Sequence, residues 1–418
     1  MGKSFVVWGL FIFTLIACLF TGCAGLAAVG RVADENDFEY IIVEGENPAV
    51  TITAYRGIST ELNIPGTIRE IPVTIIGEWA FSGKELVSVR IPDSVTVIGN
   101  NAFVGNRLVS VIIGNNVKTI GDGAFWHNHL TALVIPDSVT FIGNEAFYLN
   151  RLKSLTIGSG VTTIGNRAFD GNRLTGLIIP ENVVSIGNGA FDRNQLNSVN
   201  IPDSINEIAE ALFRGNRLSQ VNIPNSVTSI GSWAFEGNQL NSVVIPHGVT
   251  IIRERTFANN PTLTSVNIPG SVTHIGGDAF LGNHLSNITI PDSVTHIGNF
   301  AFWGNQIDSV ILPDSISHIG ELAFAGNQLT SVSIGSSVVI GFLPDDIQSH
   351  TRLRLAAYAF TYGDYFLDFT EFYQNQGLRA GTYTLHHGLW RREERGIMIS
   401  TAVSMIKLAG RVTATLVP

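Results

Sequence analysis

The chain has 418 residues, a formal net charge of −9 and only 14% charged residues. This composition excludes a typical nucleic-acid-binding protein, because such a protein needs a basic surface to neutralise phosphates. The only two cysteines are Cys18 and Cys23, so no disulfide is expected in the rest of the chain.

The N-terminus predicts an exported protein. An apolar run over residues 5–20 follows Lys3. At about 16 residues the run is shorter than the roughly 20 of a membrane-spanning helix, and it is typical of a secretory signal. Small residues precede both cysteines, so the segment resembles a bacterial lipobox, in which the cysteine is acylated and becomes the first mature residue. We favour Cys23 as the lipidation site over Cys18, and cleavage without lipid near residues 24–28 is the remaining alternative. Membrane attachment is then expected through the lipid anchor only.

Two short segments next predict a β-hairpin. Residues 40–44 and 50–55 are rich in strand-forming side chains, and the turn residues at 45–48 join them. This arrangement is typical of two antiparallel strands.

Phenylalanine then recurs at a fixed interval, and this is the strongest pattern in the chain. The recurring residues are Phe81, Phe103, Phe125, Phe147, Phe169, Phe191, Phe213, Phe235, Phe257, Phe280, Phe302 and Phe324. Every step is 22 residues except the 23 between Phe257 and Phe280. Such a period indicates one structural unit stacked on copies of itself, because a single unit cannot bury its own apolar side.

One unit, residues 86–108, shows how a coil is built. Leu86, Val89 and Ile91 predict a short strand with two side chains on one side, which a following proline ends. Gly99 is expected to supply a tight bend, and the next phenylalanine fills the interior. The sequence therefore predicts a β-rich solenoid of about a dozen 22-residue coils.

The repeated pieces IPDSVTVIGNNAF, IPDSVTFIGNEAF and IPDSVTHIGNFAF share a motif as well as a period. They resemble the BspA-like, or Treponema-type, leucine-rich repeats of bacterial surface proteins, whose units read LxxVxIPxxVxxIGxxAF. The resemblance covers about residues 55–340. It implies a leucine-rich repeat solenoid on the cell surface that binds host matrix proteins or other bacterial surface proteins, and it brings no catalytic residue.

Two coils depart from the motif. The coil that ends at Phe213 has Ala209 in place of the repeated glycine, and the coil that ends at Phe257 has Arg253 there. A local change in curvature and an irregularity that contacts a ligand are both open interpretations.

The period fades after Ile340. Residues 364–376 place four aromatic residues at helical spacing, and residues 381–390 are typical of a second hairpin. The predicted organisation is a lipoprotein signal peptide at 1–22, a tether at 23–37, an N-terminal cap hairpin at 38–55, the solenoid at 56–340, a C-terminal cap of helix plus hairpin at 341–395 and an unassigned tail at 396–418.

Several polar residues recur in register. His274, His296 and His318 occupy one place in consecutive coils, which suggests either a metal or pH-sensing site or an exposed position that tolerates many residues. An asparagine ladder that starts at Asn106 is expected to bond backbone groups in the interior, and the residue after each asparagine forms a partly basic edge. No catalytic motif is present, so neither an enzyme nor a cofactor is predicted.

The outward positions of the predicted strands are mostly small and polar, with scattered aliphatic residues, and they predict one flat, continuous sheet. The candidate protein-binding positions on it are Arg90, Ile112, Val134, Ile178, Asn200, Asn222, Val244, Asn267, Thr289 and Ile311. Such a face either binds an extended protein partner or only keeps the sheet soluble. The predicted function is non-enzymatic adhesion or protein binding at the bacterial envelope. The alternative is a scaffolding envelope lipoprotein without an external ligand.

Overall fold

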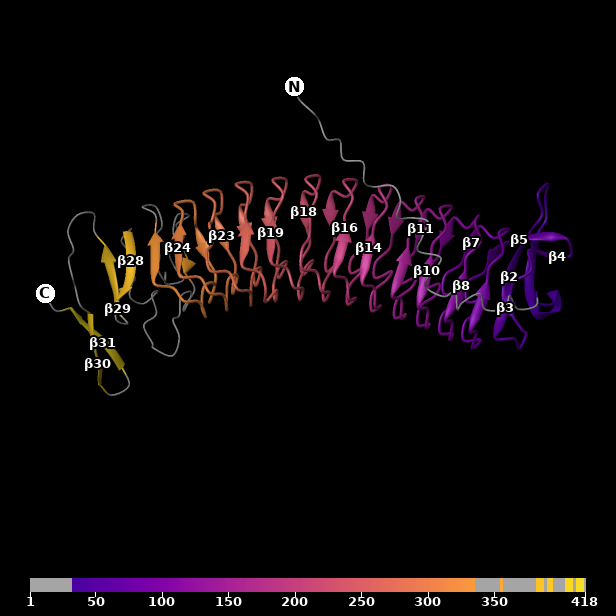
Figure 1. Cartoon of the computed structure of the whole chain (residues 1–418), viewed down its shortest axis with the longest axis horizontal. Helices are drawn as coiled ribbons and strands as arrows, with labels where there is room; N and C mark the ends of the chain where they lie inside the picture. The colour runs from indigo at the N-terminus through magenta and orange to yellow at the C-terminus, as the bar shows by residue number, and fades with distance from the viewer. Residues whose placement is uncertain are drawn as a thin grey trace, which may run out of the picture.

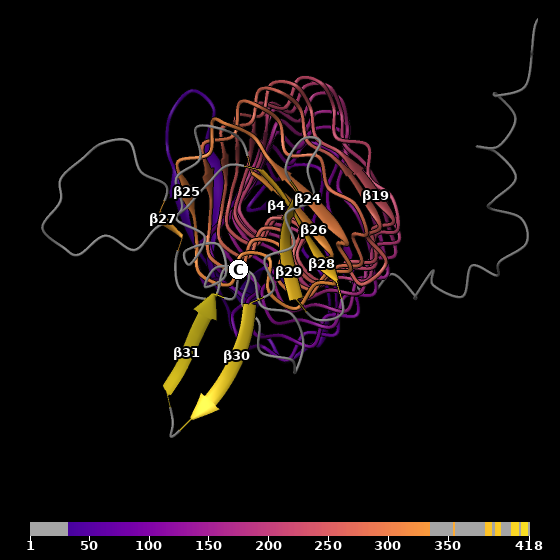
Figure 2. The same cartoon turned by 90° about the vertical axis from the view of Figure 1, so that its left-hand side faces the viewer.

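The structure is a computed structural model that describes residues 32–334, 354–355, 381–386, 389–393, 403–408 and 411–416. Its coils follow one another in chain order along a single long axis (Figure 1). Seen along that axis, successive coils superpose around a common interior (Figure 2). The predicted leucine-rich repeat solenoid is confirmed. The predicted signal peptide, with Cys18 and Cys23, lies outside the described residues.

The chain enters the solenoid through a hairpin. A short 3-10 helix, η1 (Glu35–Asp37), precedes β1 (Phe38–Val43) and β2 (Ala49–Tyr55), which pair antiparallel as the sequence predicts. β2 also pairs in parallel with β5 (Ile71–Ile76), so the hairpin extends the sheet of the following coils. β4 (Thr67–Ile68) pairs antiparallel with β5 within the first coil.

The end of the predicted tether lies against the first coil. The backbone N–H of Ala33 donates to the carbonyl oxygen of Asn63 at 3.0 Å, and Arg69 N–H donates to the Glu35 carboxylate at 3.0 Å. The described part of this segment is therefore held by the solenoid.

Most coils contain two strands on opposite sides of the core. The longer strands form what we call the front face: β3 (Glu61–Asn63), β6 (Ser88–Arg90), β8 (Ser110–Ile112), β10 (Ala132–Val134), β12 (Ser154–Thr156), β14 (Gly176–Ile178), β16 (Ser198–Asn200), β19 (Ser242–Val244), β21 (Ser265–Asn267), β24 (Ser309–Leu312) and β26 (Ser331–Ile334). After β5, short strands form the back face: β7 (Val97–Ile98), β9 (Thr119–Ile120), β11 (Phe141–Ile142), β13 (Thr163–Ile164), β15 (Ser185–Ile186), β17 (Glu207–Ile208), β18 (Ser229–Ile230), β20 (Ile251–Ile252), β22 (His274–Ile275), β23 (His296–Ile297), β25 (His318–Ile319) and β27 (Arg354–Leu355). The sequence analysis missed the back strands, because two residues are too few to show an alternating pattern.

The recurring phenylalanines form one continuous stack through the interior. All of them are fully buried, and Phe103 and Phe125 show the typical geometry, with ring centroids 5.1 Å apart and planes 4° from parallel. The widest spacing, 6.2 Å, separates Phe191 from Phe213. The rings therefore record the coil spacing, and the stack opens at the coil that carries Ala209.

Buried asparagines bond adjacent coils to each other. Asn150 accepts from the backbone N–H of Leu130 at 3.1 Å and donates to the carbonyl oxygens of Phe125 and Phe147 at 2.9 and 3.2 Å. The same pattern recurs from coil to coil, which confirms the predicted role of this ladder. It satisfies backbone groups that no strand pairs.

The glycine that follows most back strands has a role beyond the predicted bend. A Cβ atom on Gly143 would lie 2.6 Å from the backbone nitrogen of Asp122 in the preceding coil, which is closer than real contacts allow. The Gly143 N–H donates to the carbonyl oxygen of Ile120 at 2.8 Å. The glycine begins a turn, as predicted, because its carbonyl oxygen accepts from the Ala146 N–H at 3.4 Å, but it is the close approach of the two coils that excludes a side chain here.

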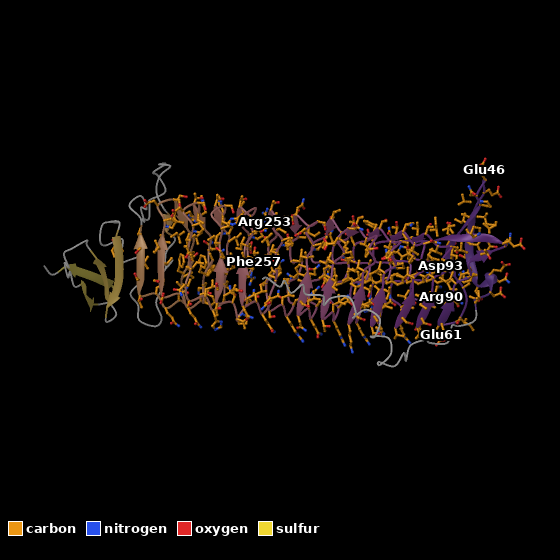
Figure 3. All side chains as sticks on the ribbon, turned by 45° about the horizontal axis from the view of Figure 1, so that its top comes forward. Glu46, Glu61, Arg90, Asp93, Arg253 and Phe257 are labelled. Carbon is orange, nitrogen blue, oxygen red and sulfur yellow. The ribbon has the colours of Figure 1, made fainter. Side chains whose placement is uncertain are left out.

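The back sheet breaks at the two coils without this glycine. Its order runs continuously from β1 to β15, then resumes as the pair β17–β18, and resumes again from β20 to β27. Ala209 follows β17 and Arg253 follows β20, where most other coils have this glycine. We call the glycine site the close-approach position, and each break lies just before a coil that carries a side chain there. Figure 3 shows Arg253 at the upper margin of the solenoid, with Phe257 in the same coil. The two irregular coils thus interrupt the sheet.

The front face is not the single sheet that the sequence predicted. Its strands pair in short groups, β3–β6–β8, β10–β12, β14–β16, β19–β21 and β24–β26. In the β10–β12, β14–β16 and β19–β21 pairs, the central inward residue is buried in the first strand, as for Leu177, and only partly buried in the second, as for Val199. In these three pairs the hydrogen-bond ladder ends after the second strand, where the inward side chain is partly exposed.

The C-terminal part of the chain adds antiparallel strands. β28 (Gly381–His386) pairs with β26 and with β29 (Leu389–Glu393), so the predicted second hairpin continues the front face. β30 (Val403–Leu408) and β31 (Arg411–Leu416) form a separate pair in the tail that the sequence left unassigned. The predicted helix over 364–376 lies outside the described residues. In the part of the chain that is described, no helix is long and apolar enough to cross a membrane.

Candidate functional site

All ten candidate positions on the front face are solvent-exposed. Eight lie on front strands, whereas Asn222 and Thr289 lie in coils whose equivalent segment forms no strand. Side chains alternate between the two sides of a strand, so each candidate residue points away from the core that its neighbours fill. The structure places these residues together on one face, as the sequence predicted. Figure 3 shows one end of this face, with Arg90 near Asp93.

Large aliphatic side chains stand out on this face. Ile178 is 75% exposed, Ile311 is 71% exposed, and Val134 and Val244 are each 64% exposed. Each has a polar residue beside it in the paired strand; Ile178, for example, is in register with Asn200. The front face thus presents separate apolar contact points among hydroxyl and amide groups. Scattered exposed apolar residues are common on proteins, but these four occupy one equivalent position of the repeat.

A groove of about 460 Å³ opens in the front face at the coil after Phe213. Its lining combines amide and hydroxyl groups with aliphatic side chains, from Gln220, Val221, Asn222, Ile223, Asn225, Ser242, Val244 and Pro246. Among the described residues, no backbone hydrogen bond joins 220–223 to either neighbouring coil. The groove therefore offers free backbone polar groups as well as side chains. Sequence reasoning missed it, although Ala209 marked the preceding coil as irregular.

The three histidines stack on the back face as their register predicts. The rings of His274 and His296 lie 4.5 Å apart and nearly parallel, and His318 follows at 5.9 Å. Burial lowers the pKa of His296, and the neighbouring charge of His274 lowers this pKa further. Within the residues that the structure describes, no group of three His, Cys, Asp or Glu side chains is arranged to hold a metal ion. The geometry therefore couples the ionisation of His296 to the charge of His274.

A buried ionic network lies along one edge of the middle coils, and the sequence analysis missed it. The Asp170 carboxylate is fully buried and accepts from Arg167 at 3.0 Å and from Arg193 at 2.8 Å. The next coil repeats the arrangement, with Asp192 bound by Arg214. The hydrogen bond to Asp170 is the largest cause that raises the pKa of Arg193. These carboxylates are compensated within the fold, and their role is structural.

The sequence profile of BspA type leucine rich repeat regions matches the chain three times, over residues 59–175, 162–286 and 273–341. Together these matches span the solenoid. No curated protein matches the chain.

Several solved structures are similar. The pneumococcal vaccine antigen PcpA is 24% identical over 78% of this chain and 85% of its own, with a TM-score of 0.50. A leucine rich cell surface protein from Faecalibacterium prausnitzii is 25% identical over 74% of this chain and 96% of its own, with a TM-score of 0.42. A leucine-rich repeat protein from Bacteroides ovatus is 21% identical over 78% and 90%, with a TM-score of 0.48. The first of these likenesses shows a shared solenoid fold.

Proposed function

Because the chain belongs to the BspA type leucine-rich repeat family, we propose that it is a non-enzymatic protein of the bacterial cell surface whose front face binds other proteins. Host matrix proteins and surface proteins of other bacteria are the proposed partners. The observation that carries this proposal is the row of exposed aliphatic side chains in register on the front face.

The physical argument starts from the cost of exposing these side chains. Covering a valine or isoleucine with a partner contributes roughly 1.5–3 kcal/mol, and a few such residues dominate a typical interface. The aliphatic residues are held on strands that the phenylalanine stack fixes, so little conformational freedom is lost when a partner binds. Serine and asparagine between them supply hydrogen bonds that fix the register of the partner.

The groove provides a second contact point on the same face. Val244 forms one of its walls, and the amides of Gln220, Asn222 and Asn225 provide donors and acceptors. An extended polypeptide that crosses the coils would place one side chain in the groove and its backbone beside the free groups of residues 220–223. This arrangement favours a protein partner over a small molecule.

The binding test compares two pairs of substitutions in the full chain. Ile178→Ser with Val244→Ser should weaken binding to immobilised host matrix proteins at least tenfold. The matched control, Val184→Ser with Ile251→Ser, also removes two exposed aliphatic residues, but outside the front face. Equal losses in both pairs, or no loss in the first, would show that the front face is not the binding surface.

The location has its own test. If the protein is displayed, protease treatment of intact cells should remove residues 34–418 while cytoplasmic proteins survive. If the solenoid survives while a known surface protein of the same cells is digested, the scaffolding alternative is favoured instead.

The anchor is tested by substitution of each cysteine. Cys23→Ala should abolish labelling of the chain by a radioactive fatty acid and release the protein into the medium. Cys18→Ala is the matched control and should leave both unchanged. The reverse result would assign the lipid to Cys18. If neither variant is labelled, the remaining alternative is cleavage of the signal peptide without lipid attachment.

A further inference from the structure

A row of polar, mostly basic side chains crosses the N-terminal half of the solenoid, although the whole chain is acidic. The row occupies the fourth position after each core phenylalanine, next to the buried asparagine ladder. Its members are Arg107, His129, Arg151, Arg173, Gln195 and Arg217, which we call the basic row. All four arginines are exposed.

The backbone fixes these residues one coil apart. The N–H of Arg151 donates to Leu130 in the preceding coil at 3.0 Å, and Arg173 N–H donates to Leu152 at 2.9 Å. The adjacent core rings lie 5.1–5.5 Å apart over most of this stretch, which sets the interval between neighbouring members of the row. The arginines stand at intervals of two, one and two coils, with His129 and Gln195 between them.

Little negative charge opposes this row. From Phe103 to Ser219, the positions two, four and six residues after each core phenylalanine hold no Asp or Glu. One of these positions holds Lys153, which adds a further positive charge. Asp170 and Asp192 are nearby in sequence, but both are buried and bound by other arginines. Among the described residues, Arg151, Arg173 and Arg217 form no ion pair, whereas Arg107 contacts Glu85 at 3.1 Å with both side chains largely exposed.

We propose that the basic row binds a linear acidic polysaccharide that carries carboxylate or sulfate groups and lies along the long axis of the solenoid. Arginine suits such groups because its planar guanidinium donates two parallel hydrogen bonds to two oxygens of one anion. The imidazole and the amide between the arginines are placed to bond sugar hydroxyl groups.

The interval between coils favours a polysaccharide over an acidic polypeptide. An extended polypeptide presents side chains on one side about every 6.7 Å, so its carboxylates fall out of register with the coils after a few residues. A chain of pyranose rings advances by nearly one coil spacing for each sugar, so anionic groups on successive sugars stay close to the register of arginines one or two coils apart. This surface is distinct from the front-face aliphatic residues, and its ligand is distinct from the protein partner.

The test measures binding of the full chain to heparin, polygalacturonate, poly-glutamate and uncharged dextran at several salt concentrations. The wild type should bind the two acidic polysaccharides, and not dextran. Arg151→Gln with Arg173→Gln should weaken this binding at least tenfold and reduce the slope of log affinity against log salt by roughly two, one for each lost contact. The melting temperature should stay unchanged, because both side chains are exposed.

The matched control removes two exposed cations elsewhere, Lys118→Gln with Arg253→Gln, and lowers the net charge by the same amount. It should keep the wild-type affinity, as should Ile178→Ser with Val244→Ser. The proposal is overturned if the wild type binds neither polysaccharide or if the control pair weakens binding as much as the arginine pair. It is equally overturned if poly-glutamate binds as tightly as heparin, since the partner would then be an acidic polypeptide.

Discussion

The carbonyl oxygen of Ile186 accepts no hydrogen bond from Ala209 in the described solenoid, although the equivalent pair in the next coil, Ile208 and Gly231, is bonded at 2.8 Å. The difference is one methyl group. A Cβ atom at Gly231 would lie 2.5 Å from the backbone nitrogen of Glu210, so a side chain at this position forces the coils apart. Ala209 therefore separates its coil from the preceding one, and the back sheet ends at β15.

The first prediction tests the close-approach position in a regular coil. Gly143→Ala should lower the free energy of unfolding by about 3 kcal/mol, because backbone atoms that cannot move aside meet the new methyl group. Gly176→Ala is the matched control, since its Cβ meets only the Ser198 hydroxyl at 3.8 Å. It should leave stability unchanged or raise it by up to about 1 kcal/mol. Urea denaturation measures both, and equal effects would contradict the steric argument.

The second prediction reverses the natural break. Ala209→Gly should let the residue-209 N–H reach the carbonyl oxygen of Ile186 and extend the back sheet by one coil. Hydrogen–deuterium exchange should then slow at residue 209, where an unpaired amide exchanges rapidly. Arg253→Gly should act in the same way at the second break. Unchanged exchange at 209 would mean that another feature of this coil keeps the sheet open.

The third prediction concerns the asparagine ladder. Asn150→Ala leaves the Leu130 N–H and the carbonyl oxygens of Phe125 and Phe147 without this partner, and it should cost roughly 3 kcal/mol of stability. Asn197→Ala is the matched control, because that side chain is exposed on the surface. It should change the urea midpoint little. A small effect of Asn150→Ala would indicate that water replaces the amide in the interior.

The repeat predicted the solenoid well because the residues that recur most regularly are buried in the core. The phenylalanine stack and the asparagine ladder must be identical in every coil, so the period of the sequence shows them directly. The repeated glycine was noticed but assigned to a bend. A sequence shows that a side chain is excluded, and only the structure shows that the backbone of the preceding coil excludes it.

The candidate site was predictable only in part. Alternation along the strands placed the ten outward positions on one face, because that needs no knowledge of coil spacing. The split front sheet and the groove beside Val244 depend on small differences in spacing between coils, which no single unit encodes. The ionic network around Asp170 was visible only as charges at neighbouring positions of consecutive coils, and pairing them required the fold.

The last prediction concerns pH. Burial and His274 lower the folded-state pKa of His296 below its ordinary value of about 6.5. Between these two pKa values the unfolded chain binds more protons than the folded protein, so stability is full above about pH 6.5 and declines as the pH falls. The His296 ring contacts His274, His318 and the Thr295 hydroxyl. None of these three groups is a carboxylate, so none of them compensates the positive charge that His296 gains on protonation.

The urea midpoint of the wild type should therefore drop between about pH 7 and pH 5 by more than that of His296→Gln. His284→Gln, an exposed histidine outside the stack, should keep the wild-type pH dependence. In NMR titrations, His274→Gln should raise the pKa of His296 only partly, because burial is the larger cause and remains. A pKa of His296 above its ordinary value, or identical pH profiles for the wild type and His296→Gln, would rule out a pH response from this stack.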